Sequence, residues 1–121
     1  MANQDHVAIV RSGNLALDKW SDTHLFDRLD LRGANLANLD LHAFNFTSAD
    51  LSGADLSHCD LSNASLVNAK LQSANLSHAN LSYAQCGNAD FEFAKLKEAN
   101  LTRACLDNGW PQFQVPKWRA L

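Results

Sequence analysis

A chain of 121 residues is long enough for one compact domain and too short for two ordinary ones. Its 13 acidic and 10 basic residues leave a net charge of −3, which argues against the clustered basic surface that nucleic-acid binding requires. No segment approaches the roughly 18 apolar residues of a membrane span, and residues 1–10 lack the basic and apolar regions of a secretory signal.

The N-terminal residues contain two helix-start signals. Asn3 is a good N-cap residue and predicts a short helix that ends at Gly13. Asn14 predicts a second helix, which it would cap and which would run through Trp20. We therefore expect residues 1–28 to form a short α-helical segment.

Residues 29–108 consist of sixteen five-residue units that follow one another without insertion or deletion. The central position of the unit is Leu in thirteen units, Phe in two and Cys in one. Two residues before the centre, twelve of sixteen positions are Ala, and the position directly before the centre is Asp or Asn in eleven. The two positions after the centre are mostly small and polar, or charged.

A period of five excludes the common regular elements for this region. On an α-helix five residues advance about 500°, so the leucines would spiral around every face. On a straight strand an odd period moves each successive Leu to the opposite face. The chain must instead bend once per unit, with Ala and Leu inside and the polar residues at the corners, where their side chains suit turns. This pattern predicts a solenoid.

Correlations at twenty residues favour four units per coil. The pairs and columns at this spacing are Gly33 and Gly53, His58 and His78, Phe26 and Phe46, and Ser48, Asn68, Asn88 and Asn108. The last column is typical of the polar ladders that stabilise stacked β-structure, and we expect it to be structural.

The units ADLSG at 49–53, ADLSH at 54–58 and ANLSH at 74–78 resemble the pentapeptide-repeat family. The resemblance covers about two thirds of the chain. It implies an all-β fold, a right-handed quadrilateral β-helix of about four coils with Leu and Ala inside. At a strand spacing of roughly 4.8 Å, such a solenoid would be about 20 Å long.

The first units depart from this pattern at the inward Ala position. Leu29, Leu39 and Phe44 occupy it, whereas every later unit has Ala or Cys59. A filled interior coil has no room for these larger side chains, so the first coil should have an open end that residues 1–28 cover.

Residues 109–121 break the repeat and concentrate apolar side chains between two prolines. We interpret them as a C-terminal cap or a partner-binding tail. Trp110 is expected to cover the last coil. Phe113, Val115 and Trp118 are the candidate residues for binding a protein partner, including a second copy of the chain.

No arrangement typical of catalysis is present, and we expect no enzyme activity, no cofactor and no metal site. The repeat Asp residues are interpreted as solvent-facing residues. Asn38, His58, His78 and Glu98 should align in one column, but on a flat exposed face that lacks groups to orient a metal.

The three cysteines lack disulfide or zinc spacing and favour a reduced, cytoplasmic setting. Cys86 is expected in the core, and Cys105 at an outward position is the more reactive thiol.

These observations favour a non-enzymatic structural or interaction module, a protein-binding scaffold whose partner is unknown and is neither nucleic acid nor membrane. The alternative implied by the resemblance is a DNA mimic that inhibits a DNA-binding enzyme such as gyrase. The repeat region together with Arg28, which directly precedes it, carries nine acidic and six basic residues. A duplex about 20 Å long would carry on the order of twelve charges, so the mimic is undercharged.

Overall fold

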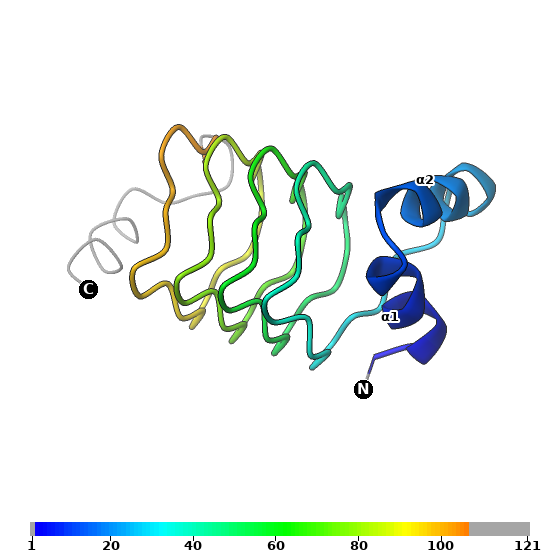
Figure 1. The fold of residues 1–121 in the computed structure, drawn as a ribbon, viewed down its shortest axis with the longest axis horizontal. Coiled ribbons are helices and arrows are strands. Elements are labelled where there is room, and N and C mark those ends of the chain that lie inside the picture. Colours follow the sequence, from blue (N-terminus) through cyan, green and yellow to red (C-terminus); the bar gives the residue numbers. More distant parts are fainter. Residues whose placement is uncertain (1, 107–121) are drawn as a thin grey trace.

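The computed structural model describes residues 2–106 and consists of two helices followed by a solenoid. Helix α1 spans Gln4–Arg11 and helix α2 spans Asn14–Thr23. Both helices lie at one end of the stacked coils (Figure 1). None of the described helices is both long and apolar enough to cross a membrane.

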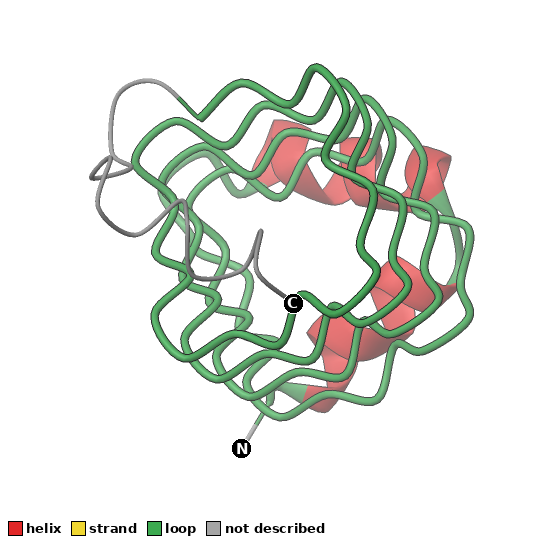
Figure 2. Cartoon of the chain, turned by 90° about the vertical axis from the view of Figure 1, so that its left-hand side faces the viewer, coloured by secondary structure: helices red, strands yellow, loops and turns green. Residues whose placement is uncertain are grey.

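Parallel bridges join residues twenty positions apart, from Asp30↔Asp50 in the first coil to Gln85↔Cys105 in the last. One coil therefore takes twenty residues and four units. The successive coils overlie one another around a common interior, with the helices across the far end (Figure 2). Each bridge is isolated, because the extended part of a unit is too short to form a longer ladder before the chain turns again.

The solenoid has four sides, which we number in chain order. The first side is 29–33, 49–53, 69–73 and 89–93; the second is 34–38, 54–58, 74–78 and 94–98; the third is 39–43, 59–63, 79–83 and 99–103; the fourth is 44–48, 64–68, 84–88 and 104–106.

Every corner from residue 33 to residue 103 contains a residue with positive φ, two positions after the central residue. At the first corner, the amide of Ala34 donates to the carbonyl of Leu31 at 3.0 Å, and Gly33 has a φ of 67°. A positive φ at the third residue of a four-residue turn is the property of a type II turn. The thirteen corner residues other than glycine include Ala43 and Phe93, which adopt this conformation at a higher energy than glycine.

The Asp and Asn residues before the centres stabilise these corners, a role beyond the solvent-facing one that their position in the repeat predicts. In each of the eleven units with Asp or Asn there, the side-chain Oδ1 accepts a hydrogen bond from the amide two residues later, at 2.9–3.4 Å. In Asn75, for example, Oδ1 accepts from the amide of Ser77 at 3.1 Å. Asp and Asn have the side-chain length and the acceptor oxygen to make this bond, which explains the sequence preference.

The core is formed by the central residues and by the Ala residues that precede them. All central residues of the second coil are completely buried, as are Ala49, Ala54 and Ala64. Phe46 is also fully buried, whereas Phe26 is 99% exposed. The twenty-residue pairing of Phe26 with Phe46 is therefore wrong, because Phe26 lies in the segment between α2 and the first coil, whose bridges begin at Asp30.

The helices cover the open end of the first coil. Leu29 and Phe44 are 5% and 4% exposed, and Leu39 packs on the same core, which includes Val10 of α1 and Leu17 of α2. The larger side chains at the inward position thus fill the space between the coil and the helices, where no preceding coil lies.

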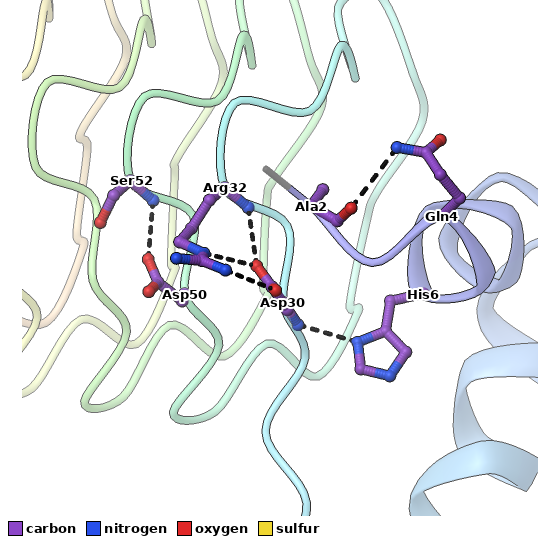
Figure 3. Close-up of polar contacts among 7 residues, drawn as sticks. All are labelled: Ala2, Gln4, His6, Asp30, Arg32, Asp50 and Ser52. Atoms are coloured by element: carbon purple, nitrogen blue, oxygen red, sulfur yellow. Dashed lines mark hydrogen bonds and ion pairs between the residues drawn. The ribbon is translucent and has the colours of Figure 1, made fainter.

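Residues near the start of α1 also replace the hydrogen bonds of a missing coil (Figure 3). Within the stack, a bridge residue makes two backbone hydrogen bonds to the neighbouring coil. The amide of Asp50, for example, donates to the carbonyl of Leu29, and the carbonyl of Asp50 accepts from the amide of Leu31. At the edge, the amide of Asp30 donates to Nδ1 of His6 at 2.9 Å, and its carbonyl accepts from the amide of Asn3 at 3.0 Å. This edge of the first side is therefore satisfied by hydrogen bonds to the N-terminal segment.

The helix starts differ in one respect from the sequence prediction. Asn3 caps α1, since its Oδ1 accepts from the amides of Asp5 and His6. Asn14, however, is the first residue of α2 and does not cap it; the capping position is Gly13, with φ 109° and ψ 175°. This conformation is accessible to glycine, so the chain reverses there and begins the second helix one residue earlier.

The corner conformation predicts opposite effects for two glycine substitutions. Gly53 has a φ of 70°, whereas Gly87 has no positive φ, and a Cβ added at Gly87 would meet open space. Gly53→Ala should lower the free energy of unfolding by about 1 kcal/mol, because an L side chain disfavours this region. Gly87→Ala should be neutral or slightly stabilising, since it restricts the unfolded chain. Chemical denaturation measures both; equal effects would contradict the corner assignment.

Candidate functional site

The column of Asn38, His58, His78 and Glu98 is present on the second side. The rings of His58 and His78 stack with centroids 4.7 Å apart and planes within 7°, and Nδ1 of His78 lies 3.0 Å from Oε2 of Glu98. The ring lone pairs lie in two nearly parallel planes, so they do not converge on one metal position. Within residues 2–106, the structure contains no group of three or more His, Cys, Asp or Glu residues that could hold a metal ion.

His42, Ser62 and Asp60 lie together on the third side, and their order differs from that of a nucleophilic triad. The hydroxyl of Ser62 donates to Oδ1 of Asp60 at 2.6 Å, and Nδ1 of His42 lies 3.0 Å from the same hydroxyl. In a catalytic triad the imidazole lies between the hydroxyl and the carboxylate and accepts the hydroxyl proton. Here Ser62 lies between the two, so the histidine does not activate it.

Serine hydroxyls lower the pKa of two carboxyls in the repeats, those of Asp55 and Asp60. The hydroxyl of Ser57 donates to Asp55 at 2.6 Å, and this hydrogen bond lowers the pKa of the Asp55 carboxyl. Ser62 lowers the pKa of Asp60 in the same way. On the first side, the guanidinium of Arg32 pairs with Asp30 and lowers the pKa of that carboxyl to about 2. All three carboxyls are therefore ionised at neutral pH and act as hydrogen-bond acceptors.

The cysteines occupy the expected positions. Cys59 and Cys86 are buried, and Cys105 is exposed. Burial raises the pKa of the Cys86 thiol to about 12 and also raises that of Cys59. The Cys59 thiol donates to the carbonyl of Leu36 at 2.9 Å. Neither buried cysteine is a reactive thiolate at neutral pH.

The fourth side is distinguished by the absence of charge. Each of the other three sides carries at least three Asp, Glu, Lys or Arg residues, whereas 44–48, 64–68, 84–88 and 104–106 contain none, and no His. Its outward residues are small or carry hydroxyls and amides: Asn45, Thr47, Ser48, Ser65, Val67, Asn68, Gln85, Gly87, Asn88 and Cys105. The hydroxyls of Thr47 and Ser65 bond across neighbouring coils at 2.7 Å. This side is a flat, uncharged polar surface.

Two exposed apolar residues adjoin the fourth side at its helical end. Leu25 and Phe26 are 77% and 99% exposed in the segment after α2. They line a groove of about 520 Å³ together with Trp20, with the charged residues Asp22, Asp27 and Arg28, and with Asn45 and Thr47 of the fourth side. We call Leu25, Phe26 and the outward residues of the fourth side the uncharged surface.

The structure describes some of the residues predicted from the sequence and not others. Phe113, Val115 and Trp118, and Trp110 as a cap, lie outside the described residues. Ser48, Asn68 and Asn88 align at one corner and share positive φ, but no hydrogen bond joins their side chains among the described residues, so the column is not an amide ladder there.

The uncharged surface was not predicted from the sequence, although the distribution of charged residues over the repeat units indicates it. Charged residues are absent from the units 44–48, 64–68 and 84–88, and the next unit of this series, 104–108, has one, Asp107.

The hydrogen bond from Ser57 to Asp55 on the second side predicts that the stability of the protein depends on pH. The folded pKa of Asp55 lies below its unfolded value of about 3.9, so its stabilising contribution is complete above that pH and is lost as the pH falls below it. Ser57→Ala should therefore reduce the acid loss of stability. Ser77→Ala is the matched control, because its partner Asn75 occupies the same repeat position and does not titrate. Melting temperatures between about pH 7 and pH 2.5 test this; equal curves for both variants would contradict it.

The stacked histidines predict weak zinc affinity. Calorimetry should detect no zinc binding at about micromolar concentration, because the two imidazoles would have to leave their stacked arrangement to share a metal. A micromolar or tighter site that disappears in His58→Ala would contradict this expectation.

Comparison with known proteins places this geometry in a family. The model of the pentapeptide repeats matches residues 26–63, 43–82 and 74–108 with 8 copies. A pentapeptide repeat protein of the Arabidopsis thaliana thylakoid lumen is 32% identical, with a TM-score of 0.63 over 65% of this chain and 54% of that chain. The present chain thus spans about half of that protein's length.

Two further solved structures share less sequence with this chain than that protein does. A pentapeptide repeat protein from Nostoc PCC 7120 is 23% identical, with a TM-score of 0.50 over 82% of this chain and 91% of that chain, which supports the fold alone. A plasmid-mediated fluoroquinolone resistance protein, QnrB1, is 20% identical over 64% of this chain and 49% of that chain, and its TM-score of 0.34 carries no argument about function. No curated protein sequence matches. Because the repeat model covers most of the chain and the coils have the corresponding twenty-residue register, the chain belongs to the pentapeptide repeat family.

Proposed function

We propose that this protein is a non-enzymatic interaction module that binds another protein chain through the uncharged surface. The observation that carries the proposal is the contrast between the fourth side and the other three. Depletion of charge, with exposed apolar residues beside it, is the compositional property of the core of a protein interface. Leu25 and Phe26 supply the apolar part.

The use of the polar residues supports a binding role over catalysis. The repeat Asp and Asn residues accept hydrogen bonds from the corner amides, and Ser62 donates to Asp60. These groups are engaged in maintaining the coil. The side chains that remain available are spread over flat faces, which suit contact with a macromolecule better than enclosure of a small substrate.

The C-terminal residues extend the proposal. Phe113, Val115 and Trp118, with Lys117 and Arg119 beside them, form a short apolar and basic stretch. We assign to it a second anchor for the partner, including a second copy. The buried thiols Cys59 and Cys86 suit a reducing compartment, and we place the protein in the cytoplasm as part of the same proposal.

The charge distribution disfavours a DNA mimic. Duplex DNA presents phosphates around its whole circumference, on the order of one charge per 1.7 Å of length. A net charge of −3, with no charged residue on the fourth side as far as residue 106, does not reproduce that distribution. We therefore expect no competition with DNA for its binding enzymes.

Capture experiments with matched variants test the interaction function. The intact protein serves as bait in an extract of its source cell, beside the double variant Phe26→Ser/Gln85→Lys. Thr102→Lys adds the same charge on the third side and is the control. We expect a protein, of another kind or the chain itself, to be retained by the intact bait and the control and reduced at least about tenfold on the double variant.

The tail is tested separately with Phe113, Val115 and Trp118 all replaced by Ala. Identical retained proteins on the intact bait and the double variant would contradict the role of the uncharged surface, whatever the tail variant shows.

A further inference from the structure

We propose that the uncharged surface binds a second copy of this chain, the two solenoids lying side by side with their fourth sides together and their axes parallel. The inference rests on the proposed interaction function and names its partner. It is carried by the charge of the four sides, by the donor and acceptor groups of the fourth side, and by the position of Leu25 and Phe26.

Charge selects the fourth side for self-association. When two copies are related by a two-fold axis along the solenoid, each coil faces the same coil of its partner, so each charge lies near its own copy. On the first side, Asp90 and Glu92 of one coil would then face the same two acids. On the second side, Lys95 and Lys97 would face two lysines. The fourth side alone avoids repulsion between like charges among the described sides.

The side chains of the fourth side are also complementary to themselves. The amides of Asn68 and Gln85 each carry donors and an acceptor, and Asn45 has two amide donors besides the Oδ1 that accepts from Thr47. The hydroxyls of Thr47 and Ser65 bond each other and keep further acceptor capacity. A surface composed of such groups can satisfy an identical surface by hydrogen bonds. A carboxylate or an ammonium surface, by contrast, offers only acceptors or only donors.

The exposed apolar residues select the parallel orientation. Leu25 and Phe26 line the groove at the helical end of the fourth side. With parallel axes these residues of the two copies meet one another, and their apolar surface leaves water. With antiparallel axes they would lie against the polar end of the fourth side around Gln85 and Cys105. Apolar contact therefore favours parallel axes.

The available area predicts a weak dimer. The fourth side measures roughly 20 Å along the axis by 10 Å across, about 200 Å² per copy. Phe26 and Leu25 add a few hundred Å² at most. The sum is below the roughly 800 Å² per partner of a standard stable interface, so association should be reversible and concentration-dependent.

Sedimentation of the full chain at concentrations up to about 1 mM tests the proposal. We expect a monomer–dimer equilibrium that Gln85→Lys weakens at least about tenfold, because the two introduced lysines face each other. Phe26→Ser should weaken it by removing the apolar contact, while Thr102→Lys should leave it unchanged. Lys70 and Lys95 occupy the same repeat position as Gln85 on other sides, and Phe26 is 99% exposed, so melting temperatures should stay near that of the intact protein.

The outcomes separate this inference from the wider function. A chain that is monomeric throughout, or a Gln85→Lys variant that associates like the intact protein, would overturn the dimer. Truncation after Gln112 removes the proposed second anchor, so it should weaken association without abolishing it; if it abolishes the dimer, the contact belongs to the tail and the inference is wrong. A monomeric chain that still captures another protein through the uncharged surface would leave the proposed function standing while the second copy fails as its partner.

Discussion

At every described corner of the solenoid one residue holds a φ between +57° and +70°, and these turns close the coil after four units. The rest of the structure depends on this geometry. It brings the central Leu residues to one interior and places residues twenty apart in register. Glycine adopts the conformation readily, but most corners use other residues at higher energy. Two kinds of hydrogen bond offset that strain: the one that the Asp or Asn side chain accepts from a backbone amide of the turn, and those between neighbouring coils.

A stack of coils satisfies its backbone groups everywhere except at its ends. The N-terminal end shows how the chain deals with this exposure: Asn3 and His6 supply a donor and an acceptor to Asp30, and Arg11 donates to the carbonyl of Asn35. The larger inward residue Phe44 fills the remaining space below the helices. Helices and coil therefore form one core, although their backbone conformations differ entirely.

Engagement of the polar residues in the turns has a consequence for function. Carboxylates and hydroxyls that resemble catalytic groups in the sequence, such as Asp60 and Ser62, are hydrogen-bonded within the coil in an order that does not activate a nucleophile. What varies from side to side is the charge of the outward residues. The uncharged fourth side, continued by Leu25 and Phe26, is thus the feature of this solenoid that folding does not explain. The interaction with another chain that we propose would account for it.

The repeat and the inward positions were predictable from the sequence, because a five-residue period with Ala and Leu two apart permits only a chain that bends once per unit. The period does not set the number of units per coil, and the twenty-residue register was predicted instead from correlations such as His58 with His78 and from the resemblance to the family. The bulky residues Leu29 and Phe44 likewise predicted an open end. Three features required the tertiary structure. Gly13, rather than Asn14, caps α2; Phe26 lies outside the column of Phe46; and Leu25 and Phe26 meet the fourth side at one groove. Each depends on how the N-terminal segment packs against the first coil, and packing between segments distant in sequence follows no local period.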